Sequence, residues 1–137
     1  HNLTNIINLL NQSEDWGPVT EIVDEIEQMP TDAPSIRESE YSAWITIQIG
    51  CNNSCTFCIV PSVRGPEISR RPGDIINEAQ QLVDTGVKEV TLLGQNVNSY
   101  GHDLKIDNKS TPYFANLLTQ LNKIDGLERI QLKNLVL

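Results

Sequence analysis

Residues 44–58, which read WITIQIGCNNSCTFC, decide the fold of this 137-residue chain. The first six are mostly β-branched or aromatic and form a short apolar run, which is typical of a buried strand that ends at Gly50. Cys51, Cys55 and Cys58 follow at once. The stretch therefore predicts a strand whose carboxyl end carries a loop rich in sulfur ligands.

A helix and a further strand follow this loop. Apolar side chains in residues 74–85 recur at helical spacing and predict an amphipathic helix. Pro72 precedes this helix, Asp74 is expected to cap it and Gly86 is expected to end it. Residues 87–93 then predict a second buried strand.

A second helix and a third strand complete the pattern. Residues 95–111 are polar and predict a loop, and residues 112–123 predict a helix capped by Ser110 or Thr111. Residues 127–132 predict the third strand. The helical side chains expected to point inward are Phe114, Leu117, Leu118 and Leu121. This alternation predicts an α/β fold with parallel strands.

Ligands of parallel α/β folds gather beyond the carboxyl ends of the strands. The cysteine loop, residues 51–58, follows the first predicted strand, and Gly94, Gln95 and Asn96 follow the second. Gly94 lets a ligand approach the backbone closely, and the two amides can hydrogen-bond to it, although a turn with solvated amides is the alternative. The order of the elements therefore predicts that both loops meet at one rim of the sheet.

The first forty residues differ in character from the rest. Residues 2–12 predict a short amphipathic helix, residues 19–27 an edge strand or an irregular segment, and residues 30–40 a linker. Residues 1–40 hold nine of the 18 acidic residues and one of the 10 basic ones, whereas the remainder balances nine against nine. The net charge of -8 therefore does not exclude an anionic substrate for the second part.

The three cysteines point to a metal centre. An odd number of cysteines on one loop argues against a disulfide framework, and thiolates this close can converge on one soft metal. Structural zinc usually takes two pairs of ligands, and the only histidines are His1 and His102, so a zinc site would be incomplete. An iron–sulfur cubane takes four thiolates, so three would leave one iron open.

This loop resembles that of the radical S-adenosylmethionine enzymes, with Phe57 just before the last cysteine. Residues 50–76, GCNNSCTFCIVPSVRGPEISRRPGDII, and residues 89–101, EVTLLGQNVNSYG, are similar to the methylthiotransferase family within that group. The resemblance extends over about residues 36–130. Residues 94–101, GQNVNSYG, resemble the branch that acts on N(6)-isopentenyladenosine of tRNA more than the ribosomal-protein and threonylcarbamoyladenosine branches.

The resemblance implies a fold and a reaction. Residues 39–137 are expected to form about the first half of a radical S-adenosylmethionine (β/α) barrel, and residues 1–38 to be the tail of an N-terminal methylthiotransferase domain with its linker. The implied reaction is methylthiolation at carbon 2 of N(6)-isopentenyladenosine next to the tRNA anticodon. Two alternatives stay open: the same chemistry on a ribosomal protein or another tRNA base, and a non-catalytic zinc-binding module.

The resemblance also implies cofactors and the residues that bind them. Cys51, Cys55 and Cys58 are expected to hold a [4Fe–4S] cluster whose open iron binds S-adenosylmethionine. The residues expected beside S-adenosylmethionine are Phe57, Gly94, Gln95 and Asn96. The basic residues expected to bind the cofactor carboxylate or tRNA phosphate, with a plain surface role as the alternative, are Arg64, Arg70 and Arg71.

The remaining expectations concern the whole protein. The chain starts at His1, so we expect either a trimmed start or a piece of a longer protein. The family carries a second [4Fe–4S] cluster and an RNA-binding domain outside this sequence, so the chain alone is expected not to turn over. The resemblance implies a cytoplasmic enzyme that uses an external electron donor, and no apolar run approaches the roughly 18 residues of a membrane span. An uncovered sheet edge predicts self-association.

Overall fold

The computed structural model describes residues 5–20, 39–104 and 113–134. The chain divides into two compact units, residues 1–30 and residues 31–137. The first unit contains the helix α1 (Ile6–Trp16). This helix confirms the one expected over residues 2–12, but it begins later and continues to Trp16. The expected domain boundary after residue 38 and most of the expected 19–27 segment lie outside the described residues.

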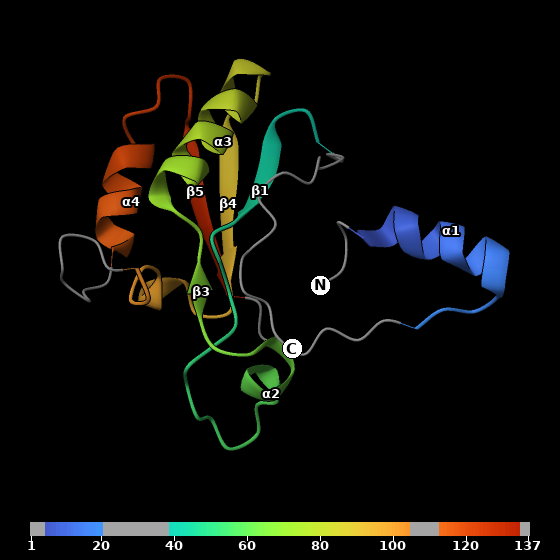
Figure 1. Cartoon of the computed structure of the whole chain (residues 1–137). Coiled ribbons are helices and arrows are strands. Elements are labelled where there is room, and N and C mark those ends of the chain that lie inside the picture. The colour runs from blue at the N-terminus through green and yellow to red at the C-terminus, as the bar shows by residue number, and fades with distance from the viewer. Residues whose placement is uncertain (1–4, 21–38, 105–112, 135–137) are drawn as a thin grey trace. The chain divides into compact units, whose positions relative to one another are not determined.

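A parallel sheet of three strands forms the centre of the second unit (Figure 1). The strands β1 (Ser42–Thr46), β4 (Glu89–Gly94) and β5 (Arg129–Asn134) lie in the order β1-β4-β5. Ile45 pairs with Leu92, and Leu92 pairs with Leu132 in the next strand. The predicted α/β fold with parallel strands is therefore confirmed.

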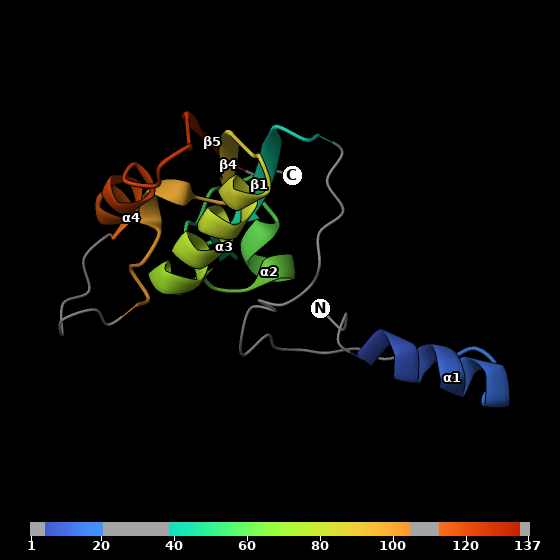
Figure 2. The ribbon, with the colours of Figure 1, turned by 90° about the horizontal axis from the view of Figure 1, so that it is seen from above.

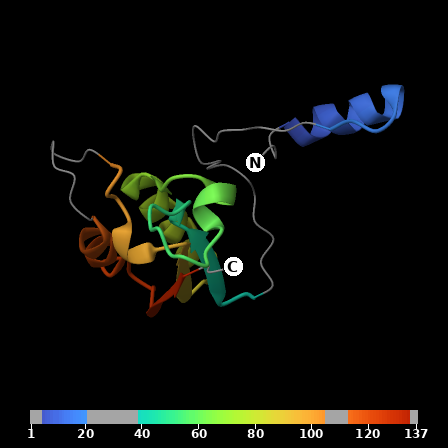
Figure 3. The same cartoon turned by 90° about the horizontal axis from the view of Figure 1, so that it is seen from below.

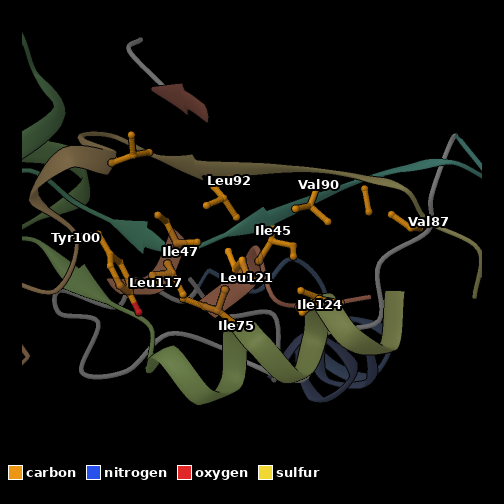
Figure 4. Close-up of a cluster of buried hydrophobic side chains, with 13 residues drawn as sticks. Ile45, Ile47, Ile75, Val87, Val90, Leu92, Tyr100, Leu117, Leu121 and Ile124 are labelled. Carbon is orange, nitrogen blue, oxygen red and sulfur yellow. The ribbon is translucent and has the colours of Figure 1, made fainter. Parts of the chain in front are cut away.

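Two helices cover one face of this sheet (Figure 2). They are α3 (Pro72–Asp84) and α4 (Phe114–Leu121), and both confirm the helices predicted from apolar spacing. Figure 4 shows the apolar core between the sheet and the helices. Its fully buried members include Ile45, Ile75, Val90, Leu92, Leu117 and Leu121. This packing holds the strands, and so the loops at their carboxyl ends, in a fixed register.

The first predicted strand is divided into two. β1 ends at Thr46, and β2 (Gln48–Ile49) leaves the parallel sheet to pair antiparallel with β3 (Ile68–Ser69). The short helix α2 (Val60–Arg64) lies between them in the chain, beyond the carboxyl ends of the strands (Figure 1). The sequence did not predict β3 or α2, because neither is long enough to show a periodicity.

The helix caps differ from those predicted. Arg71 is the N-cap of α3, and Asp74 lies inside its first turn without a side-chain cap. Asp74 was expected to cap because its carboxylate suits that role, but Pro72 already begins the helix two residues earlier. The expected caps of α4, Ser110 and Thr111, lie outside the described residues. Among its inward residues, Leu117 and Leu121 are buried, and Phe114 and Leu118 are partly buried against the core.

The polar segment after β4 contains a further short element that the sequence did not predict. Residues Val97–Ser99 form a 3-10 turn, η2, between the end of β4 and Tyr100. Tyr100 is fully buried, and its hydroxyl donates a hydrogen bond of 2.6 Å to the carbonyl oxygen of Arg70. The loop after β4 is therefore tied to the segment that follows β3. No helix in the described residues is long and apolar enough to cross a membrane.

Candidate metal and cofactor site

The cysteine loop begins at a point where the backbone is tightly constrained. Gly50 has a φ of 73°, which favours glycine, and a Cβ atom there would lie 1.9 Å from the carbonyl oxygen of Pro66. The amide of Cys51 then donates to the carbonyl oxygen of Gly65 at 3.1 Å. The side chain of Asn52 accepts a hydrogen bond of 3.1 Å from the amide of Glu67. The start of the loop is thereby fixed against the segment that leads into β3.

All three cysteines line one open cavity of about 540 Å³. Cys51 is buried, Cys58 is half-buried and Cys55 is exposed. Figure 3 shows from below the end of the sheet where this loop and α2 lie. The structure thus brings together the three residues that the spacing singled out, at the carboxyl end of the β1 strand.

The lining of the cavity is uncharged. Its other members are Asn52, Asn53, Ser54, Pro61, Gly65 and Pro66. Cys51 Sγ accepts a hydrogen bond of 3.5 Å from the amide of Asn53, and the Cys58 amide donates to the carbonyl oxygen of Cys55 at 3.1 Å. Within the described residues, no group of three or more His, Cys, Asp or Glu side chains is already gathered closely enough to hold a metal ion.

Exposed apolar side chains stand close in the sequence to the residues that line the cavity. Phe57 is 89% exposed, and Ile59 and Val63 are also exposed. This exposure does not favour a role for Phe57 in core packing. A large exposed aromatic side chain on the cysteine loop is available to contact a bound ligand.

The loop after β4 lies at the same end of the sheet (Figure 1). Gly94 is buried, and a Cβ atom there would lie 3.3 Å from Val97 Cγ1 and 3.4 Å from Gln48 Oε1. Gln95 and Asn96 are half-buried, and Gln95 Oε1 has no hydrogen-bond partner in the described part of the chain. Both loops predicted to carry chemistry therefore end at one rim, although the cavity itself is lined only by the cysteine loop and residues of the 61–66 segment.

The three arginines have different environments. Arg64 and Arg71 are exposed, at the end of α2 and directly before α3. Arg70 is only 7% exposed, and its Nη1 donates to Glu78 Oε2 at 2.6 Å and to the Thr46 carbonyl oxygen at 3.0 Å. Its guanidinium thus joins β3 to α3 and to the end of β1.

Two buried polar residues escaped the sequence analysis. Gln48 is fully buried and Glu67 is 7% exposed. Gln48 could have been found as the one amide in a run of β-branched residues, which a buried strand does not ordinarily carry. Glu67 shows no such signal, since a carboxylate in a polar loop is usually solvated.

A known family model matches more than half of this chain. The model of the Radical SAM superfamily matches residues 45–132. This range begins within β1, includes the cysteine loop and the whole of β4, and ends within β5. The chain belongs to the Radical SAM superfamily. Membership implies a [4Fe–4S] cluster and S-adenosylmethionine, and the donor set fits the cluster. Three thiols on one cavity can supply three thiolate ligands, and the chain has no fourth cysteine.

Three similar curated relatives of this radical SAM chain are named tRNA-2-methylthio-N(6)-dimethylallyladenosine synthase. The protein from Corynebacterium diphtheriae is 52% identical over 134 residues, which cover 96% of this chain and 26% of the relative. The protein from Mycobacteroides abscessus is 52% identical over 135 residues with the same coverage, and that from Mycolicibacterium smegmatis is 48% identical over 134 residues. The chain spans about a quarter of the length of these relatives.

Proposed function

We propose that this chain is the first part of the radical S-adenosylmethionine domain of a tRNA methylthiotransferase. Its reaction would be methylthiolation at carbon 2 of N(6)-isopentenyladenosine next to the anticodon. The observation that carries the proposal is the cavity lined by all three cysteines, in a chain about half identical to relatives named for this product. The parallel sheet supports it, because both candidate loops follow strands that run in the same direction.

In this proposal Cys51, Cys55 and Cys58 hold the [4Fe–4S] cluster as thiolates. When bound, the cluster supplies the electron that cleaves S-adenosylmethionine reductively. The uncharged lining of the cavity leaves the thiolates without a competing cation, and burial of Cys51 limits the access of water. The chain's contribution is to position and shield the reacting groups.

The flanking residues bind S-adenosylmethionine and the RNA. Gly94, Gln95 and Asn96 offer a close backbone approach and amide groups, and the exposed ring of Phe57 stacks against an apolar part of the cofactor. Arg64 and Arg71 have exposed guanidinium groups that are suited to a carboxylate or a phosphate. Arg70 belongs to the same basic group, and we propose that it acts by keeping the β3 segment in place.

The rest of the proposal concerns the longer protein. We infer that residues 1–38 end an N-terminal methylthiotransferase domain that carries a second [4Fe–4S] cluster, and that residues 39–137 begin a barrel completed by later strands. The isolated chain would then be inactive. The whole enzyme would work in the cytoplasm with an external electron donor.

The test is nucleoside mass spectrometry of tRNA. Deletion of the coding sequence should abolish 2-methylthio adenosines and let N(6)-isopentenyladenosine accumulate, and the wild-type gene should restore them, whereas a Cys55→Ser gene should not. Ser54→Ala, in the same cavity lining, is the matched control and should restore them. Unchanged 2-methylthio adenosines would instead direct the search to a ribosomal protein or another base. Purified protein with zinc and no acid-labile sulfide would favour the zinc module.

A further inference from the structure

Glu67 is a buried carboxylate that the proposed chemistry does not use. It is 7% exposed, and among the described residues it makes no ion pair. Burying a carboxylate without a cation costs free energy unless hydrogen bonds stabilise it. Its position therefore calls for an explanation beyond packing.

The carboxylate of Glu67 contacts the loop that follows β4. Ser99 Oγ lies 2.6 Å from Glu67 Oε1 and 2.9 Å from the carbonyl oxygen of Asn96. A hydroxyl has one proton, and the shorter contact to a charged oxygen is the stronger hydrogen bond. The hydroxyl also accepts a bond of 3.2 Å from Gln48 Nε2.

The side chain of Gln48, which donates to Ser99, lies beside Gly94. It is fully buried, and its Oε1 has no hydrogen-bond partner in the described part of the chain. That oxygen lies 3.4 Å from the position of a Cβ atom on Gly94. Ser99 thus holds a side chain that lies beside Gly94.

The backbone of Glu67 contacts the other loop. Its amide donates to Asn52 Oδ1, and Asn52 stands between the first two cysteines. One residue thus contacts the cysteine loop through its amide and, through its carboxylate, Ser99 in the loop that follows β4. The two loops come from different strands.

We infer that Glu67 is a positioning residue for S-adenosylmethionine binding. It sets the place of the cysteine loop relative to Gly94 through Ser99 and Gln48. The inference rests on the proposed function, since it assumes that a ligand spans the two loops. It predicts that breaking the link weakens S-adenosylmethionine binding and leaves cluster assembly intact, because the amide of residue 67 still anchors Asn52.

The experiment uses the whole protein, reconstituted anaerobically, with Glu67→Ala, Ser99→Ala and the double variant. Iron and sulfide content are measured first. S-adenosylmethionine is then titrated against the electron paramagnetic resonance signal of the reduced cluster. Each single variant should keep wild-type iron content and need about tenfold more S-adenosylmethionine for half of the spectral change. The double variant should be no worse than either single one, because both break the same link.

Two control variants accompany these: a conservative substitution of Glu67 and a substitution of a carboxylate elsewhere. Glu67→Gln keeps an acceptor for the Ser99 hydroxyl and should stay within about twofold of the wild type. Glu89→Ala removes a half-buried carboxylate at the start of β4, at the opposite end of this strand from Gly94, and should leave the titration unchanged.

The outcomes separate the inference from the proposed function. The inference is overturned if the Glu67→Ala and Ser99→Ala proteins need no more S-adenosylmethionine than the wild type for half of the spectral change. It is also overturned if both variants lose iron. Additive effects in the double variant also overturn it. A wild-type signal that does not respond to S-adenosylmethionine overturns the proposed function and the inference together.

Discussion

Gly50 packs against the backbone of Pro66 so closely that a Cβ atom on Gly50 would lie 1.9 Å from the Pro66 carbonyl oxygen. The neighbouring atom is backbone, so it cannot rotate away as a side chain would. Gly50 also has a φ of 73°. The entry into the cysteine loop therefore requires glycine for two independent reasons.

Substitution of Gly50 separates these two reasons. Gly50→Ala should lower the free energy of unfolding by more than about 2 kcal/mol, because left-handed backbone and the contact with Pro66 both disfavour it. Gly65→Ala is the matched control, since Gly65 has a φ of 75° but no atom within 4 Å of its Cβ position. It should cost only about 1–2 kcal/mol. Chemical denaturation measures both, and equal effects would contradict the close approach.

The neighbouring arginines provide a second prediction. Arg70→Ala should lower the free energy of unfolding by about 3 kcal/mol, because it leaves Glu78 and the Thr46 carbonyl oxygen without their partner. Arg71→Ala should stay within about 0.5 kcal/mol of the wild type, since its side chain is exposed. The same Arg71 variant should weaken binding of tRNA to the whole protein several-fold. A stable Arg70→Ala protein would contradict the internal role of that guanidinium.

Tyr100 gives a pH-dependent prediction. Burial, followed by the nearby Asp103 carboxylate, raises the pKa of Tyr100 above its ordinary value. The folded protein therefore retains this proton above about pH 10, where the unfolded chain loses it. The raised pKa of Tyr100 therefore has no effect on the pH dependence of unfolding below about pH 10. Above that pH the folded state becomes less stable as the pH rises, because the unfolded state can lose a proton that the folded state retains. Denaturant unfolding from pH 8 to pH 11.5 should show a steeper alkaline loss for the wild type than for Tyr100→Phe.

The Tyr100→Phe variant also has an effect at neutral pH. It removes the donor to the Arg70 carbonyl oxygen, a buried hydrogen bond of 2.6 Å. The free energy of unfolding should fall by about 1–2 kcal/mol at pH 7. An alkaline profile identical to that of the wild type would show that Tyr100 does not titrate as its burial requires.

The free edge of the sheet leads to a prediction about association. β5 pairs with β4 on one side and has no strand on its other side among the described residues. An uncovered strand edge pairs readily with other chains, so the isolated 137-residue chain should self-associate with rising concentration. Leu132→Lys, on this edge, should reduce association, whereas Asn122→Lys, at the exposed end of α4, should not. Light scattering after gel filtration measures this, and a monomer at all concentrations would contradict it.

The sequence was sufficient to predict the parallel sheet and its helices. The β-branched run before Gly50 and the apolar spacing of residues 74–85 reflect burial on one face, and burial is the property that periodicity reports. The cysteine site was predictable for a different reason. Three sulfur ligands within eight residues must share one loop, so their meeting needs no knowledge of the tertiary structure.

The features that the sequence did not predict depend on contacts between segments that are distant in the sequence. Gln48 turns out of the sheet because β2 pairs with β3, about twenty residues later in the chain, and no local pattern encodes that pairing. The internal ion pair of Arg70 and the contact between Glu67 and Ser99 arise in the same way. Arginine and glutamate are surface residues by default, so sequence reasoning assigns them to solvent.

The most direct test of the account concerns the cysteines themselves. The whole protein and its Cys51→Ser, Cys55→Ser and Cys58→Ser variants are reconstituted anaerobically, with Ser54→Ala as control, and analysed for iron, sulfide and zinc. Each cysteine variant should lose about four iron and four sulfide per chain relative to the wild type and the control. It should also lose the change that S-adenosylmethionine causes in the paramagnetic resonance spectrum. Variants that keep their iron and this response, or a wild type that holds zinc without sulfide, would contradict the account.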